Sequence, residues 1–144
     1  MNGATMTLSD LRNDHAALTA MFRELELKIG SDTPPPPVEL FELRRRFSSL
    51  LIGHLKSADW LLYPRLLASE DPEIAATARR LVEEMGGLAQ TYNVFTERWD
   101  ALAIEAGWPR YQAECNAMIK ALTQRVLCEK KILYPLLERV ERAA

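Results

Sequence analysis

Two segments of this chain are imperfect copies of each other, and they hold the residue types best suited to chemistry. The copies cover residues 54–64 and 125–135, so equivalent positions differ by 71, and both copies end in Leu-Tyr-Pro. Each copy has two special positions four residues apart, which places both on one face of a helix. The residues at these positions are His54 and Ala58 in the first copy, and Arg125 and Glu129 in the second.

The helix breakers in the sequence predict four long helices joined by short connections. A capping-box-like start and a glycine end are typical of helix boundaries, and prolines interrupt helices unless they stand in the first turn. The first helix is expected from Thr7-Leu-Ser-Asp10 to Gly30, the second from about Val38 to Ala68, the third from Asp71-Pro72, and the fourth from Gly107-Trp108-Pro109 nearly to the C-terminus.

Each of the four segments carries an apolar stripe at spacings of three and four residues, and none alternates with the period of a strand. We therefore expect an all-α fold, an antiparallel up-down four-helix bundle, forming a single domain over residues 1–144. The stripes are Leu11, His15, Leu18, Phe22, Leu25, Ile29; then Leu43, Phe47, Leu50, His54, Ala58, Leu61; then Ile74, Ala78, Leu81, Met85, Leu88, Tyr92, Phe95, Trp99, Leu102; and finally Cys115, Met118, Leu122, Arg125, Glu129, Ile132, Leu136.

Four polar residues interrupt these apolar stripes: His15, His54, Arg125 and Glu129. Each stands near the middle of its expected helix, so the four are predicted to converge at one level of the bundle. A buried charge or imidazole is costly unless it is paired or bound to a metal. The alternative is that each histidine is a hydrogen-bonded core residue with no joint role.

The sequence resembles the hemerythrin-like (HHE cation-binding) proteins. The resemblance rests on Asn13-Asp14-His15, on the two His-x-x-x-Glu-like segments and on the repeated Leu-Tyr-Pro, and it covers about residues 8–140. It implies an up-down bundle with two iron atoms at its centre. Members of the family bind dioxygen or sense oxygen, nitric oxide or iron. The resemblance implies ligands on all four helices, including a His-x-x-x-carboxylate pair on the second and on the fourth.

Carried over residue by residue, the resemblance leaves the metal site incomplete. It implies His15, His54 and Glu129 as surviving metal ligands. Ala58, Met85 and Arg125 occupy the other implied positions, with Glu84-Met85 at the third-helix position. Alanine has no donor atom, a thioether is a poor ligand for hard iron, and a guanidinium repels a dication. With only two histidines in the chain, no other imidazole can substitute.

The incomplete ligand set leaves three hypotheses for the centre of the bundle. An intact di-iron site would need more donors than these three residues supply. A single iron or zinc on His15, His54 and Glu129 is an alternative, since two histidines and a carboxylate form a recognised open ligand set. The third hypothesis, which we favour, is that Arg125 replaces the metal. It would pair with Glu129 at i+4 and donate to His15 or His54. We therefore expect no bound cofactor.

The third expected helix contains Gly86-Gly87 in its middle. Two glycines there weaken a helix by about 1 kcal/mol each relative to alanine. They predict either close packing of a neighbouring helix or a kink in the third helix itself.

The bulk properties exclude several classes of protein. The net charge is −2 and the pI about 5.7, which does not favour nucleic acid or a membrane surface as a partner. No apolar run reaches the ~18 residues of a membrane span, and the N-terminus lacks signal-peptide regions. Cys115 and Cys128 are expected roughly 20 Å apart on one helix, beyond disulfide reach, which favours a cytoplasmic location with free thiols.

The function expected from these features is that of a non-enzymatic regulatory or protein-interaction module with an unidentified protein partner. A metal-binding sensor or oxygen-binding protein is the alternative, and homodimerisation remains open. A histidine phosphotransfer domain fits less well, because His54 lies on an apolar stripe rather than at the surface. No pairing of a nucleophile with a base indicates a hydrolase.

Overall fold

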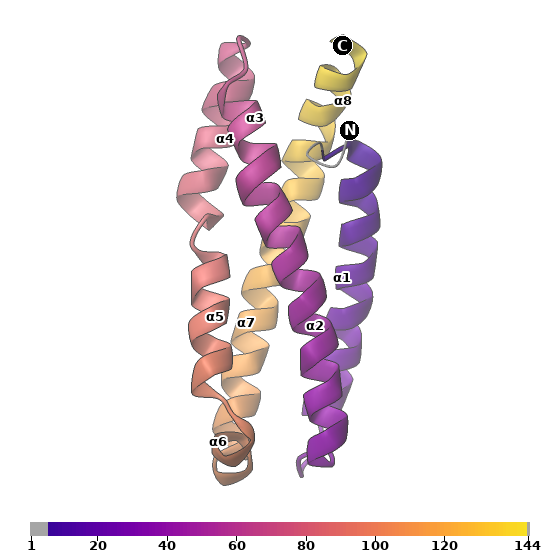
Figure 1. The fold of residues 1–144 in the computed structure, drawn as a ribbon, viewed down its shortest axis with the longest axis vertical. Coiled ribbons are helices and arrows are strands. Elements are labelled where there is room, and N and C mark those ends of the chain that lie inside the picture. The colour runs from indigo at the N-terminus through magenta and orange to yellow at the C-terminus, as the bar shows by residue number, and fades with distance from the viewer. Residues whose placement is uncertain (1–5, 144) are drawn as a thin grey trace.

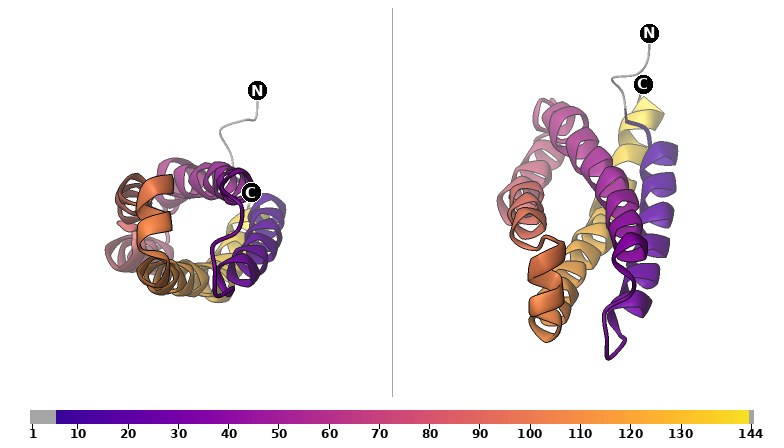
Figure 2. Two further views of the ribbon diagram at one scale, coloured as in Figure 1. Left: turned by 90° about the horizontal axis from the view of Figure 1, so that it is seen from below. Right: turned by 60° about the horizontal axis from the view of Figure 1, so that its bottom comes forward.

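The computed structural model describes residues 6–143, and nearly all of them are helical. Along the chain the helices group into four long rods. The rods alternate in direction, and viewed end-on they surround a central axis (Figures 1 and 2). The all-α helical bundle expected from the sequence is therefore confirmed. The first rod is α1 Leu8–Ile29, and the second consists of α2 Pro37–Ser57, η1 Ala58–Leu62 and α3 Tyr63–Leu67. The third rod consists of α4 Pro72–Met85, α5 Leu88–Arg98 and α6 Ala101–Ala106. The fourth rod consists of α7 Trp108–Cys128, η2 Glu129–Leu133 and α8 Tyr134–Ala143.

Local signals place the helix ends where the sequence predicts them. At the start of α1, the Thr7 hydroxyl accepts from the Asp10 backbone N–H, and the Asp10 carboxylate accepts from the Thr7 N–H. This reciprocal capping box satisfies two otherwise free donors. Gly30 ends α1, and the Asp71 side chain caps α4 by accepting from the Glu73 N–H.

The second and fourth rods each contain a π-helical turn, η1 and η2, at equivalent positions of the sequence repeat. The Tyr63 N–H bonds to the Ala58 carbonyl, and the Tyr134 N–H bonds to the Glu129 carbonyl, in both cases five residues back. Pro64 or Pro135 follows at once. A proline ring clashes with the carbonyl four residues earlier, and the widened π turn relieves that clash.

The π turns shift the buried stripes by one residue, which the predicted 3–4 spacing missed. Leu62 and Leu133 are fully buried, whereas the predicted Leu61 and Ile132 are only partly buried. The extra residue in each turn delays the next inward-facing position. In α2 the prediction of Leu50 was also off by one position, because Leu51 is the buried residue.

The third rod is not one helix, and the prediction of a single third helix is wrong. It breaks at Gly86-Gly87, between α4 and α5, and again at Trp99-Asp100, before α6. Of the two readings of the glycines, the structure bears out the kink. A Cβ on Gly86 would lie 2.5 Å from the Val82 carbonyl oxygen of the same helix, and one on Gly87 would meet nothing within 4 Å. After the second break the register changes, and Leu102 is exposed rather than buried.

The core consists of two apolar clusters with a polar layer between them. One cluster fills the end of the bundle where α6 lies, and the other fills the end where α1 begins and α8 ends. His15 stands on α1 between Leu11 of one cluster and Leu18 of the other. The buried polar residues of the described chain are His15, His54, Arg125 and Glu129. The predicted convergence at one level is confirmed.

Among residues 6–143, no helix combines the length and the apolar character that crossing a bilayer requires.

Candidate metal centre

Glu129 lies at the middle of the polar layer and is completely buried. Its Oε1 atom accepts hydrogen bonds from His15 Nε2 at 2.8 Å and from His54 Nε2 at 3.0 Å. Its Oε2 atom accepts from the Tyr63 hydroxyl at 2.9 Å and from Arg125 Nε at 3.0 Å. A carboxylate offers about four acceptor positions, so all four are occupied by donors of the protein itself.

These donors decide the ionisation of Glu129. Burial alone would raise the pKa of a carboxyl group. The hydrogen bonds from His15 and His54, together with the charge of Arg125, outweigh burial and hold the pKa of Glu129 well below its usual range. Glu129 is therefore a carboxylate throughout the neutral pH range, and the layer must contain positive charge to balance it.

Arg125 supplies permanent positive charge, and its side chain is only 2% exposed. Besides Glu129, Nη2 donates to Asp59 Oδ1 at 3.1 Å, and Nη1 donates to the Met85 carbonyl oxygen at 3.2 Å. The guanidinium also lies 5.7 Å from the centre of the Tyr63 ring. Arg125 thus connects the second, third and fourth rods.

The contact with Met85 explains how the broken helix is tolerated. The last four carbonyl groups of a helix lack partners within the helix, and the negative end of the helix dipole favours a cation there. Met85 is the last residue of α4, and its carbonyl oxygen receives Arg125 Nη1. Arg125 therefore caps the C-terminus of α4 from inside the bundle.

The outer nitrogens of both histidines are also hydrogen-bonded. His15 Nδ1 lies 2.8 Å from the Tyr134 hydroxyl, and His54 Nδ1 lies 3.0 Å from Asp14 Oδ2. His54 thus faces a carboxylate at each nitrogen, which requires both nitrogens to carry a proton. Burial lowers the pKa of His54, but the hydrogen bonds to Asp14 and Glu129 outweigh it and raise the pKa to about 9. His54 is an imidazolium at neutral pH.

The layer is hydrogen-bonded throughout. Among the residues that the structure describes, no buried side-chain nitrogen or oxygen lacks a partner. Most of the charge is compensated: the cations Arg125 and His54 face the carboxylates of Glu129, Asp59 and Asp14, and the latter two are partly exposed to solvent. Such compensation is what allows ionised groups to remain inside a protein.

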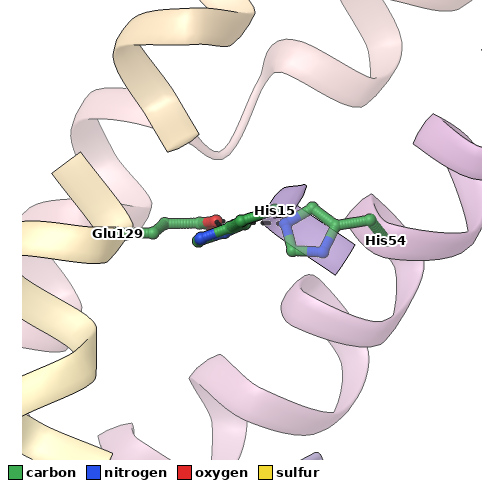
Figure 3. Close-up of side chains that lie close together, drawn as sticks. All are labelled: His15, His54 and Glu129. Carbon is green, nitrogen blue, oxygen red and sulfur yellow. Dashed lines mark hydrogen bonds and ion pairs between the residues drawn. The ribbon is translucent and has the colours of Figure 1, made fainter. Parts of the chain in front are cut away.

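His15, His54 and Glu129, the three predicted metal ligands, lie together at the centre (Figure 3). One donor atom from each lies within 4.8 Å of the others. The three positions at which the sequence predicted a missing ligand add no further metal-donor atoms to the centre. Ala58 is a buried alanine, Met85 packs against the apolar cluster at the end where α1 begins, and Arg125 donates hydrogen bonds. Glu84, the neighbour of Met85, is exposed.

This donor set does not fit two iron atoms. A di-iron centre in a helical bundle draws on carboxylates and histidines from four helices, some of which bridge both metals. Here three donors come from three rods. Glu129, the only buried carboxylate among residues 6–143, already binds four protein donors, one of them the Arg125 cation. The predicted Arg125–Glu129 pair is present, but the predicted contacts of Arg125 with His15 or His54 are not. Its remaining donors bind Asp59 and Met85 instead.

Sequence reasoning missed four residues of the layer. Tyr63 and Tyr134 are equivalent tyrosines of the repeated Leu-Tyr-Pro, and Asp14 stands in Asn13-Asp14-His15. The patterns were therefore visible, but the partners of these side chains were not. Asp59 follows Ala58, and no signal in the sequence indicates that it turns toward Arg125.

The comparisons with known proteins agree with this architecture. A family model described as the hemerythrin HHE cation binding domain matches residues 6–137, nearly the whole chain. The protein therefore belongs to the hemerythrin HHE family. It is a hemerythrin-like helical bundle with a candidate metal-binding triad of His15, His54 and Glu129. No curated protein and no solved structure matches the chain.

Proposed function

We propose that this protein is a hemerythrin-type module that has given up the di-iron centre and acts, without enzymatic activity, as a regulatory module through binding a protein partner. The observation that carries the proposal is the saturation of Glu129 by four protein donors, one of them a buried guanidinium. Two protein cations, Arg125 and His54, take the charge-balancing role that iron has in the family.

The chemistry of the layer supports a metal-free state. A dication bound to Glu129 would have to share that carboxylate with Arg125. At about 4 Å and an effective dielectric near 20, each pair of unit charges repels by about 4 kcal/mol, and a dication doubles this. Binding through His54 also requires that its proton leave. With a pKa of about 9, removing that proton at pH 7 weakens binding about a hundredfold.

The layer also supports a non-enzymatic role. Both histidines are at least 96% buried, and each ring nitrogen is engaged with another side chain. General acid–base catalysis needs a group within hydrogen-bond reach of a substrate. Here the titratable groups bind each other instead.

A second candidate is a mononuclear metal sensor. It is favoured by one observation, the approach of donor atoms of His15, His54 and Glu129 to within 4.8 Å. Two histidines and a carboxylate can hold iron or zinc, with water completing the coordination. In this state the metal would replace the protons on His15 Nε2 and His54 Nε2.

Metal analysis distinguishes the two candidates. The chain is purified without chelator, incubated with Fe(II) or Zn(II), desalted, and its metal content measured by plasma mass spectrometry. The proposal expects well under one metal per chain, with the same trace in His15→Ala and His54→Ala. One metal per chain that disappears in both variants would favour the sensor. Two irons per chain would contradict both candidates.

A further inference from the structure

A groove runs along the outside of the bundle between α1 and the rod formed by α7, η2 and α8. The volume of this open groove is about 600 Å³. On the α1 side its lining includes the buried His15 and three small exposed residues, Ala16, Thr19 and Ala20. The opposite wall includes Tyr134 and Leu127, and Leu127 is 49% exposed. Small residues on one helix let a second helix approach closely, so the shape suits an added helix.

The groove is positively charged in a protein whose net charge is negative. Arg12, Arg23 and Lys130 line it, and no carboxylate is among its lining residues. Arg12 Nη2 lies 3.6 Å from Glu138 Oε1, which stands outside the lining. Within residues 6–143, Arg23 and Lys130 take part in no ion pair. These two cations are therefore available to an acidic ligand.

The spacing of the charges indicates the form of that ligand. Arg12 and Arg23 are 11 residues apart on α1. This is about three helical turns, or about 16 Å, and both point to the same side. A ligand helix repeats its faces with the same period, so acidic residues three turns apart on it can meet both arginines. Leu27 lies one turn beyond Arg23 on α1, outside the lining of the groove, and is 79% exposed.

We propose that this groove docks an acidic amphipathic helix of a partner protein. The inference rests on the proposed function as a protein-interaction module and identifies the surface that performs it. Charge complementarity sets the register of the partner helix through Arg12 and Arg23, and Lys130 adds a cation on the opposite wall. The exposed 3.6 Å pair of Arg12 with Glu138 is weak enough to be exchanged for a carboxylate of the partner. The small residues of α1 and the exposed Leu127 provide apolar contact. A helix laid in a groove is a common mode of peptide recognition.

The test uses the full chain and a defined probe. The probe is a fluorescein-labelled peptide of about 18 residues, long enough to form a helix. It carries leucine and alanine along one face and glutamates about three turns apart at its edge. A control peptide has glutamine in place of each glutamate. Binding is measured by fluorescence anisotropy, at low and at high salt.

Two matched pairs of variants locate the binding site. Arg23→Glu reverses a charge in the groove, and Arg79→Glu makes the same change on the exposed face of α4, outside the groove. Ala20→Trp adds a large side chain to the lining of the groove, and Ala76→Trp adds the same bulk to the exposed face of α4. All four positions are exposed, so the variants are expected to keep the helical circular dichroism of the parent.

The proposal expects micromolar binding of the glutamate peptide, weakened about tenfold by Arg23→Glu and by Ala20→Trp. Arg79→Glu, Ala76→Trp and the parent chain should bind it equally, and the glutamine peptide should bind far less tightly. The proposal is overturned if the parent does not bind at about 1 mM peptide, or if both charge reversals weaken binding equally. It is also overturned if Arg23→Glu instead disrupts a dimer or binding to anionic lipid vesicles. The metal content of the same samples tests the proposed function separately.

Discussion

At the scale of single residues, the centre of this protein depends on Arg125. A buried ion pair is costly to form, because both ions lose their hydration, and costly to break, because the remaining ion has no partner. Arg125 meets this demand with three acceptors in three different rods: Glu129, Asp59 and the Met85 carbonyl. The guanidinium therefore connects three rods at the centre of the bundle, as the metal ions and their ligands connect the helices in a di-iron protein.

Replacing Arg125 with an apolar side chain of similar size should therefore be severe. Arg125→Met leaves Glu129 without its permanent cation and the α4 C-terminus without its cap. We expect a loss of about 3–5 kcal/mol in the free energy of unfolding, measured with urea. Arg79→Met on the exposed face of α4 serves as the control and should change stability by less than about 0.5 kcal/mol. A loss below about 1 kcal/mol for Arg125→Met would show that the contacts are not essential.

The protonated state of His54 predicts a dependence of stability on pH. Its pKa is raised from 6.5 to about 9 in the folded chain. Its contribution is therefore fully present below about pH 6.5, where folded and unfolded chains both carry the proton, and is lost as pH rises through about 9. This amounts to about 3 kcal/mol across that range. Urea titrations at several pH values measure it.

The His54→Asn variant provides the comparison for that titration. It removes the titrating group, so its stability should be nearly constant between about pH 6.5 and 9. If the parent chain shows the same flat profile, His54 is not an imidazolium in the folded protein. The charge balance described for the layer would then be wrong.

At the scale of elements, the three departures from the family pattern belong together. Ala58 removes a ligand, Arg125 replaces another, and the helix that should carry a third breaks after Met85. The break frees the Met85 carbonyl, which then accepts from Arg125. The kink in the third rod and the internal arginine are therefore parts of one arrangement, and the kink depends on Gly86.

The two adjacent glycines provide a matched pair of substitutions. A Cβ on Gly86 would lie 2.5 Å from the Val82 carbonyl oxygen, which belongs to rigid helix backbone, whereas Gly87 has open space. Gly86→Ala should therefore destabilise the chain by about 1–3 kcal/mol. Gly87→Ala should be neutral or stabilise by up to about 1 kcal/mol, because it restricts the unfolded chain. Equal effects in thermal or urea unfolding would contradict the assigned geometry of the kink.

At the scale of the whole molecule, the metal-free account predicts that stability is independent of metal. A ligand that binds only the folded chain stabilises it by about 2.7 kcal/mol at a hundred times its Kd. In a protein of this size that would raise Tm by several degrees. We expect a Tm shift below about 1 °C on adding a chelator, Fe(II) or Zn(II), measured by calorimetry. A rise of about 5 °C with either metal would favour the mononuclear candidate.

Features of the molecule that depend on local sequence signals could be predicted from the sequence, whereas contacts between distant residues could not. Breakers and apolar periodicity act locally, so the helical bundle and the polar level of His15, His54, Arg125 and Glu129 were predictable. The one-residue shift after each π turn was not, because Pro64 and Pro135 alter the helix geometry that the 3–4 spacing assumes. Contacts such as Arg125 with Asp59 depend on tertiary placement, which no local pattern encodes.

Crystals of the protein grown with ferrous iron would show whether protein cations occupy the place of paired iron. Anomalous-difference maps at the iron edge would locate any bound metal. We expect no peak between His15, His54 and Glu129, with Arg125 Nε still hydrogen-bonded to Glu129. Two peaks bridged by Glu129, with Arg125 displaced from it, would contradict the account.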